Sequence, residues 1–423
     1  MAMDENASAA NGLLNRRGLL TLGSAAGASA LLTPVLGHAS SVAQARGDEP
    51  WRSGSGTPPS AYGAEPAIAA LKRERVSGHP FGPAAGSSST PLQLLNGTLT
   101  PNGLHFERHH SGIPAIDAER HRLTVHGLVQ RPLRFSLDAL HRYPHSTRLL
   151  FLECSGNSYQ NMAPEPPDLT AGELHGLVSC AEWTGVPLAT LLDEAGVDPA
   201  ARWIVAEGAD ASGTNRSVPL SIARDDAMIA LYQNGEPLRA AQGYPMRLLV
   251  PGCEGNISIK WLRSLKLTEA PAQTREETSK YTDLKPDGTA RQFSLRMEVK
   301  SVITAPSGTM TLPAPGVYEI SGLAWSGAGS IRSVEVSADG GKTWAEAALQ
   351  SEPGPLRPVR FRIPWRWRGQ RAVLQSRAID SAGHVQPNRE QAFAGQAQQA
   401  FYHFNAIQSW GVDEAGRVTN VYA

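Results

Sequence analysis

The sequence has 423 residues, a length that predicts two or three domains. Lysine plus arginine and aspartate plus glutamate each number 39, so the formal net charge is zero, which argues against a nucleic-acid-binding surface. Apolar residues make up 41% and charged residues 18%, a balance that disfavours wholesale disorder. The 41 glycines and 31 prolines favour a protein rich in strands and loops.

The first segment has the pattern of an export signal. Arg16 and Arg17 precede a mildly apolar run that reaches Leu36, and small residues follow at 39–45. Pro34 breaks this run, which is too weakly apolar for a membrane-spanning helix. Residues 1–45 are therefore predicted to be a twin-arginine signal peptide with cleavage within 39–45, which places the protein in the periplasm without a membrane anchor. This route exports folded proteins, and so it favours a complex redox cofactor.

The next part of the chain predicts a mixed α and β domain. Residues 46–90 are rich in turn-forming residues and predict an extended lead-in, with one short helix at 67–76. From residue 91 to about 275, strands and short helices alternate with long loops and without a βαβ rhythm, which predicts an α+β domain. The expected strands are Leu123–Gly127, Arg148–Glu153 and Met246–Val250, and the expected helices are Ser136–His141 and Leu188–Ala195.

Short strands follow one another closely in residues 276–390, which predicts an immunoglobulin-like β-sandwich. A hairpin turn is expected at Asp339–Gly341, and the tryptophans of this region are expected to pack in the core and at an interface. Residues 391–423 are expected to form a C-terminal tail. The expected strands are 317–320, 331–337, 343–347, 359–363 and 372–379.

Three segments could carry chemistry, although each has a plain structural alternative. Cys154 ends a predicted strand and could ligate a soft metal, whereas a lone cysteine is more often a small buried apolar residue. The cluster at 105–110 holds three histidines and Arg108, which suit a cofactor phosphate, while zinc lacks further ligands nearby. Residues 247–261 combine turn glycines with Arg247 and Lys260, either as a phosphate cradle or as an ordinary strand–turn–strand. Cys180 and Cys253 keep the structural interpretation, and no C-x-x-C-H motif for covalent haem is present.

Taken together and in order, these segments resemble the sulfite oxidase family of molybdenum enzymes from about residue 91 to residue 390. The resemblance implies a molybdopterin-binding α+β domain followed by an immunoglobulin-like dimerisation domain. The motifs are Phe106-x-Arg108-x-His110, Cys154-x-Gly156-Asn157, Ala181-x-Trp183-x-Gly185-Val186-Pro187-Leu188, Asn234-Gly235-x-Pro237-Leu238, Gly243-Tyr244-Pro245-x-Arg247, Val250-Pro251-Gly252-x-x-Gly255, Lys260-Trp261, Val334–Ser337 with Asp339-Gly340-Gly341-x-x-Trp344, and Arg377-Ala378-x-Asp380.

The resemblance also implies roles for individual residues. Cys154 would be the thiolate ligand of molybdenum held by molybdopterin, and Arg108 and Tyr281 would act beside the metal on an anionic sulfur substrate. No haem is expected in this chain, so electrons would pass to a separate c-type cytochrome subunit. The residues implied to bind the cofactor are Phe106, Arg108, His109, His110, Cys154, Asp210, Arg247, Ser258, Ile259 and Lys260.

Two positions depart from the typical sulfite oxidase pattern. Tyr159 stands where an arginine is typical, five residues after the cysteine, and Gln242 stands where a histidine is typical. The missing cations weaken the expected capture of free sulfite. Within the family, the chain most resembles the sulfane dehydrogenase branch, whose substrate is a sulfane sulfur on a cysteine of a carrier protein. The alternatives are a dehydrogenase of free sulfite, a reductase of oxidised methionine and a non-catalytic scaffold subunit. The resemblance further implies a homodimer formed through the C-terminal domain.

Overall fold

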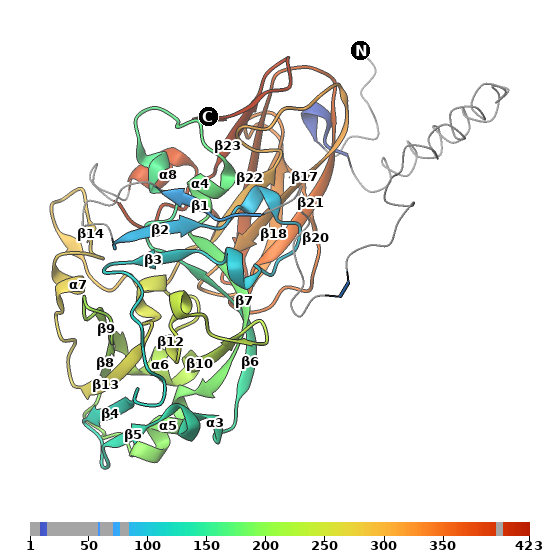
Figure 1. Ribbon diagram of the computed structural model, residues 1–423. Coiled ribbons are helices and arrows are strands. Elements are labelled where there is room, and N and C mark those ends of the chain that lie inside the picture. Colours follow the sequence, from blue (N-terminus) through green and yellow to red (C-terminus); the bar gives the residue numbers. More distant parts are fainter. Residues whose placement is uncertain (1–8, 15–57, 60–70, 77–83, 395–400) are drawn as a thin grey trace.

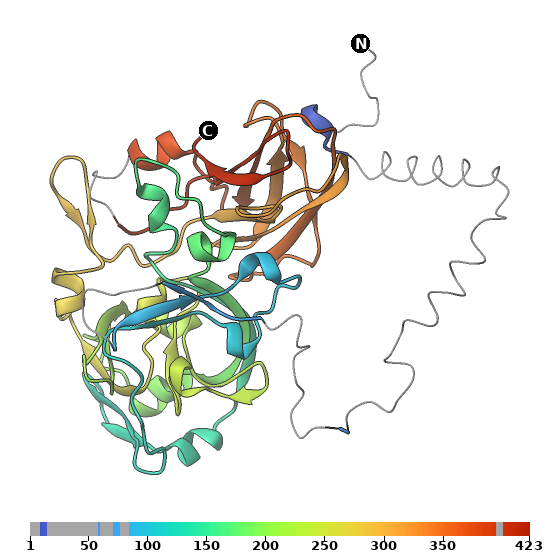
Figure 2. The same cartoon turned by 45° about the horizontal axis from the view of Figure 1, so that its top comes forward.

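The computed structural model describes residues 9–14, 58–59, 71–76, 84–394 and 401–423. The predicted signal peptide lies outside the described residues except for 9–14. Two lobes are visible: a lower lobe with mixed strands and short helices, and an upper lobe built of strands (Figures 1 and 2). None of the helices in the described part of the chain is long and apolar enough to cross a membrane.

Two five-stranded sheets and one three-stranded sheet build the lower lobe. In one large sheet the order is β11-β10-β7-β6, with β12 also paired to β10; in the other it is β5-β4-β13-β8-β9. The small sheet has the order β1-β2-β3, and β14 and β15 form a hairpin. The bounds are β1 Glu74–Val76, β2 Gly86–Ser89, β3 Glu107–His109, β4 Leu123–Gly127, β5 Leu133–Phe135, β6 Ser146–Glu153, β7 Val178–Pro187, β8 Trp203–Gly208, β9 Asn215–Pro219, β10 Met228–Gln233, β11 Glu236–Pro237, β12 Arg247–Leu249, β13 Leu262–Thr268, β14 Asp283–Leu284 and β15 Ala290–Arg291.

Short helices and 3₁₀ turns connect the strands, and local sequence explains where α3 begins and where α5 ends. The Ser136 side chain accepts a hydrogen bond from the Ala139 amide (3.1 Å) and caps α3, while Gly196 (φ +68°) ends α5. Both predicted helices are thereby confirmed. The helices are α3 Leu137–His141, α4 Ala171–His175, α5 Leu188–Ala195, α6 Leu220–Asp226, α7 Arg275–Thr278 and α8 Arg389–Ala394, and the 3₁₀ turns are η1 Ala10–Gly12, η4 Leu92–Leu94, η5 Asn102–Leu104, η6 Tyr159–Met162, η7 Ala240–Gln242 and η8 Gly255–Ile257.

The upper lobe is a β-sandwich, as predicted. One sheet has the order β16-β17-β21-β20 and the other β19-β18-β22-β23-β24. Of the four tryptophans expected to pack in the core and at an interface, Trp325, Trp365 and Trp367 are buried within this lobe, while Trp344 is half-buried. The strands are β16 Lys300–Ala305, β17 Gly316–Trp325, β18 Ile331–Ser337, β19 Ala345–Glu346, β20 Ala348–Leu349, β21 Val359–Trp367, β22 Ala372–Asp380, β23 Ser409–Val412 and β24 Val418–Val421.

The structure differs from the sequence-based expectation in two segments. Residues 391–423 are not only a tail, because β23 pairs with β22 and β24 pairs with β23, so the last strands extend the sandwich. The short helix expected at 67–76 is also wrong in its described part, where Glu74–Val76 pairs with Gly86–Ser89 as a strand. In both segments the pairing partner decides the conformation, and that partner cannot be recognised from local pattern alone.

A buried ion pair joins the two lobes. Glu153, the last residue of β6, is 1% exposed and accepts hydrogen bonds from Lys300 Nζ (3.1 Å) and Trp325 Nε1 (2.6 Å), both of the sandwich. The Asn157 side-chain amide also donates to Glu153 (2.9 Å). Because an unpaired buried carboxylate is costly, these partners fix the end of β6 relative to the upper lobe.

Candidate active site

One pocket in the lower lobe collects all the residues that the resemblance assigned to the site. It encloses about 750 Å³ of space, part of it open to solvent. The segment around β3, the end of β6, the turn at 210–214, the loops on either side of β12, and Tyr281 each contribute to its wall. The predicted residues among its lining are Phe106, Arg108, His109, His110, Cys154, Asp210, Arg247, Ser258, Ile259, Lys260 and Tyr281.

Cys154 enters the pocket from the end of β6. Its amide donates to the Leu177 carbonyl (2.9 Å), and its carbonyl accepts from the Asn157 amide (2.8 Å), so the backbone is held on both sides. Gly255 approaches closely: a Cβ at that position would lie 2.9 Å from the Glu153 carbonyl oxygen. The glycine therefore lets the 255–257 turn close over the strand end that carries the cysteine.

The three cysteines have different surroundings. Burial raises the pKa of Cys154, while the Gly156 amide and the Arg108 guanidinium act in the opposite direction. For Cys180 and Cys253, burial raises the pKa to about 12. These two thiols are buried away from the pocket, as their structural interpretation predicted. Cys154 is thus the thiol placed for chemistry, and binding a metal would favour its thiolate.

Buried cations form one wall of the pocket. Lys260 Nζ contacts His109 Nδ1 (2.8 Å) and donates to the carbonyls of Arg108 (3.1 Å) and Ala241 (3.2 Å). Arg247, which is 4% exposed, donates to the Ser258 carbonyl (2.9 Å) and to Gln242. Burial and the neighbouring Arg247 hold the pKa of Lys260 well below its usual value.

The histidines of the cluster are neutral, not cationic. Burial, together with nearby Lys260 or Arg108, lowers the pKa of His109 and of His110 to about 3. Burial lowers the pKa of His105 to about 3 as well. These rings therefore act as hydrogen-bond donors and acceptors in the pocket wall at neutral pH.

This arrangement suits an anionic ligand with many acceptor atoms. Arg247 Nε, His105 Nε2 and His110 Nδ1 are buried without a hydrogen-bond partner. The Asp210 carboxylate, which also lines the pocket, accepts hydrogen bonds from Thr214 and Ser212 of its own turn. Three cations, Arg108, Arg247 and Lys260, line the pocket together with the two carboxylates Glu107 and Asp210. The phosphate and polar ring edges of molybdopterin match the unpartnered nitrogens of Arg247, His105 and His110.

Tyr281 closes the pocket beside the histidines. It is 9% exposed, and its hydroxyl lies 3.1 Å from His110 Nε2. Burial raises the pKa of Tyr281, so the phenol is protonated and can donate a hydrogen bond. Its φ of 46° lies in the left-handed region, which is unfavourable for a bulky residue and requires support from the surroundings.

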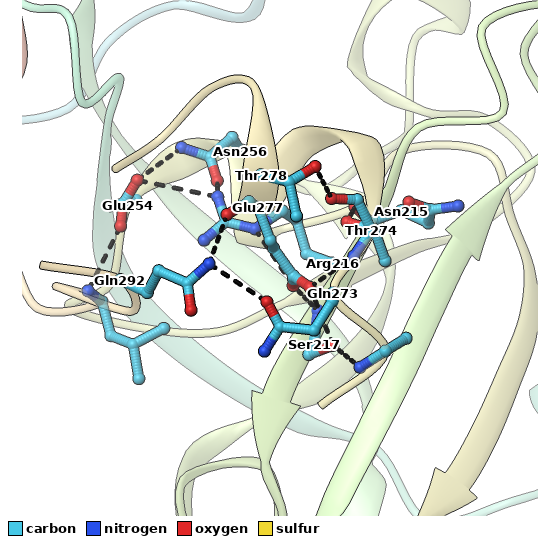
Figure 3. A network of polar contacts seen from close by, with 12 residues as sticks. Asn215, Arg216, Ser217, Glu254, Asn256, Gln273, Thr274, Glu277, Thr278 and Gln292 are labelled. Atoms are coloured by element: carbon cyan, nitrogen blue, oxygen red, sulfur yellow. Dashed lines mark hydrogen bonds and ion pairs between the residues drawn. The ribbon is translucent and has the colours of Figure 1, made fainter. Parts of the chain in front are cut away.

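Sequence reasoning missed a second group of polar residues directly behind the pocket. Arg216, Glu254 and Glu277 are each at most 1% exposed and lie in the network of Figure 3. No local sequence signal marks them, because Arg216 stands in the polar run Asn215-Arg216-Ser217 and the three charges meet only in the folded structure. The pocket lining also contains residues that the resemblance did not assign individually: His105, Glu107, Leu152, Thr214, Gln242, Gly255, Asn256 and Trp261.

A cluster of protein ligands typical of zinc does not occur within the described ranges, where no three His, Cys, Asp or Glu side chains gather to hold a metal ion. By the resemblance to the sulfite oxidase family, molybdenum would be held by the pterin and one protein thiolate and would need no such cluster. Cys154 is the cysteine that lines the pocket and could supply that thiolate.

Comparison with known proteins covers both lobes. Residues 110–276 match the family described as oxidoreductase molybdopterin binding domain, and residues 291–409 match the Mo-co oxidoreductase dimerisation domain. Mitochondrial sulfite oxidase of Mus musculus is 32% identical over 324 residues, which cover 70% of this chain and 59% of that protein. Sulfite oxidase of Gallus gallus is 30% identical over 332 residues, 71% of each chain. The chain thus spans about 59% of the length of the mammalian sulfite oxidases it matches.

A solved structure is similar over nearly its full length. A chain in the crystal structure of the sulfane dehydrogenase SoxCD from Paracoccus pantotrophus is 42% identical to this chain, with a TM-score of 0.86. The similarity covers 89% of this chain and 97% of that chain. It therefore extends over both lobes.

Proposed function

Because the chain belongs to the sulfite oxidase family of molybdenum enzymes, we propose that it oxidises a sulfane sulfur held on a cysteine of a carrier protein. The chain is a molybdopterin-dependent oxidoreductase of the kind that acts on sulfur. The finer assignment of substrate is supported by the 42% identity with a sulfane dehydrogenase, compared with about 30% for the sulfite oxidases.

The observation that carries the substrate proposal is the environment of Tyr159. Its ring packs on Phe401 with centroids 4.7 Å apart, and it is not among the residues that line the pocket. A typical sulfite oxidase has an arginine at this position. Without that cation, electrostatic capture of a small free dianion is weaker, whereas a sulfur presented by a protein obtains binding energy from the carrier surface.

The pocket residues suggest a division of roles. Arg247, Lys260 and the segment 106–110 would hold the cofactor phosphate and pterin edges, and Cys154 would be the protein ligand of molybdenum. Arg108 would neutralise negative charge on the substrate, and the protonated hydroxyl of Tyr281 would donate to a substrate oxygen. The bound cofactor would supply oxygen-atom transfer and accept two electrons.

Partners and location complete the proposal. The electrons would leave to a separate c-type cytochrome subunit, since the sequence has no C-x-x-C-H motif for a covalent haem of its own. The match of residues 291–409 to a dimerisation domain supports a homodimer. We place the enzyme in the periplasm on the strength of Arg16 and Arg17 ahead of an apolar run.

Purified enzyme tested on two substrates distinguishes the proposals. Molybdenum content is measured first, and turnover with an artificial electron acceptor is then followed on free sulfite and on a carrier protein bearing a cysteine-bound sulfane sulfur. We expect turnover on the carrier and little on sulfite. Fast sulfite turnover without carrier turnover would assign the chain as a sulfite dehydrogenase. A protein without molybdenum and without turnover on either substrate, whose function in the cell survives Cys154→Ala, would be a non-catalytic scaffold.

A further inference from the structure

A fully buried cation lies directly behind the pocket. Arg216, in β9, has a side chain with no exposed surface, and its guanidinium carbon is 5.0 Å from the centroid of the Tyr281 ring. Tyr281 lines the pocket, whereas Arg216 does not. The arginine therefore meets the site through the face of the tyrosine ring, a stacking geometry that planar guanidinium groups favour.

Two buried carboxylates hold this guanidinium in place (Figure 3). Arg216 Nη1 lies 3.7 Å from Glu254, and its Nε lies 3.6 Å from Glu277. Nη1 also donates to the Asn256 side chain. Glu277 is itself fixed by the Ser217 hydroxyl (3.1 Å) and the Thr274 amide (3.0 Å). The cation is thus clamped by elements that are far apart in sequence.

The same network reaches the residue that follows Cys154. Asn256 donates to the Ser155 hydroxyl (3.2 Å) and to Glu254 (2.8 Å). His403, which lies 3.7 Å from Glu254, donates its backbone amide to the Ser155 carbonyl (2.9 Å). One cluster of buried charges therefore contacts the turn of the thiolate ligand and the ring of Tyr281.

Folding alone does not require such a cluster. Buried ion pairs are often replaceable by apolar side chains with little loss of stability, because desolvation offsets much of their attraction. Two nitrogens of Arg216, Nε and Nη2, also lack a hydrogen-bond partner. A buried cation with incomplete hydrogen bonding calls for a specific reason. The neighbouring Tyr281 has a strained backbone (φ 46°), and the contact of Arg216 with its ring can support that conformation.

We propose that Arg216 is a positioning residue for Tyr281: its clamped guanidinium holds the phenol ring in the orientation that directs the hydroxyl into the pocket. This inference rests on the proposed function, in which that hydroxyl touches the substrate. Arg216 itself contacts neither substrate nor cofactor. None of the family motifs quoted above includes Arg216. Its place behind the Tyr281 ring identifies it.

A double-mutant cycle tests the inference on the molybdenum-loaded enzyme. Arg216→Lys keeps the charge that Glu254 and Glu277 require but loses the planar stack. We expect it to lower kcat about 10- to 100-fold, the range for a group displaced by about 1 Å, with KM and molybdenum content nearly unchanged. In a Tyr281→Phe background, the same change should lower kcat less than about twofold, because no hydroxyl remains to be positioned.

A second readout does not depend on turnover. In protein labelled with 3-fluorotyrosine, the ¹⁹F resonance of Tyr281 is identified by its loss in Tyr281→Phe. Arg216→Lys should move or broaden this resonance. Arg377→Lys is the matched control, since that guanidinium stacks on Trp344 (4.2 Å) in the sandwich, and it should leave both kcat and the Tyr281 resonance unchanged. If Arg216→Lys does not fold, the double variant Arg216→Met with Glu277→Gln is used in its place, because it removes the buried cation together with one of its carboxylate partners.

The outcomes separate the two levels of the proposal. A Tyr281→Phe enzyme with unchanged kcat would contradict the role of Tyr281 in the proposed function. If Tyr281→Phe lowers kcat as expected, but Arg216→Lys lowers kcat by the same factor in the wild-type and Tyr281→Phe enzymes, only the positioning role is overturned. An unmoved Tyr281 resonance in Arg216→Lys would overturn it as well.

Discussion

The two lobes of this molecule differ in where their buried charges lie. The sandwich buries tryptophans and aliphatic side chains, and its buried Lys300, Arg360 and Asp380 do not line the pocket. The lower lobe has an equally apolar core between its sheets, but beside that core it buries Arg216, Arg247 and several histidines. Apolar burial explains stability in both lobes, so the buried charges that line the pocket or contact its lining, such as Arg247 and Arg216, indicate function.

Removing the Cys154 thiol should produce the largest effect. Cys154→Ala deletes a side chain that the fold does not need but that molybdenum would require. We expect turnover to fall about a thousandfold or more, with the midpoint of thermal unfolding nearly unchanged. Steady-state kinetics and calorimetry on the same preparation test this. Retained turnover would show that the pocket works without its thiolate.

A core substitution in the sandwich should lower stability and leave turnover unchanged. Trp410→Ala removes a fully buried ring and should lower the free energy of unfolding by about 3–5 kcal/mol. The kcat per bound molybdenum of the folded fraction should stay the same, because Trp410 lies in the other lobe. Denaturant unfolding and metal-normalised kinetics measure both quantities. A lower kcat in the folded fraction would mean that the lobes are coupled.

Lys260 should matter for cofactor retention and not for the fold. Lys260→Met removes a buried cation whose ligand would be an anion, and we expect cofactor affinity to fall about 10- to 100-fold, as for one charged hydrogen bond. Molybdenum retained after dialysis gives the readout. Lys266→Met, an exposed position on β13, is the control and should retain the wild-type content. Equal losses in both variants would argue against a cofactor role for Lys260.

Restoring the missing cation should change substrate preference. Tyr159→Arg is expected to raise kcat/KM for free sulfite about tenfold, a gain equivalent to about 1.4 kcal/mol. Because the new charge acts on a dianion, the gain should shrink as ionic strength rises. Sulfite kinetics over a salt series tests both points. An unchanged KM for sulfite would contradict the explanation based on missing charge.

The smallest expected effect is a dependence of stability on pH. Hydrogen bonds and charge from Glu254 and Glu298 outweigh burial and hold the pKa of His403 well above 6.5. Its contribution is therefore fully present below about pH 6.5 and is lost as pH rises towards the folded-state pKa, by at most about 1.4 kcal/mol per pH unit. Urea unfolding across pH 6–9 should show this decline. His403→Gln should flatten it, and an equal decline in that variant would assign it to another group.

Sequence patterns predicted the regular elements and the convergence of the pocket. The β4 strand, the α3 and α5 helices and the sandwich follow from local periodicity and capping, and the ordered motifs brought distant residues into one site. The Arg216 network was not predictable, because its members at 216, 254, 277 and 403 meet only through tertiary structure. The pairing of β23 and β24 was missed for the same reason.

The most direct test of a molybdenum site at Cys154 is X-ray absorption at the molybdenum edge. The spectrum of the wild-type enzyme is compared with that of Cys154→Ser, which keeps the size of the side chain but replaces its sulfur. We expect the variant to lose one sulfur neighbour from the molybdenum shell while the pterin sulfurs remain. An identical sulfur shell in both proteins would contradict the assignment of Cys154 as the ligand.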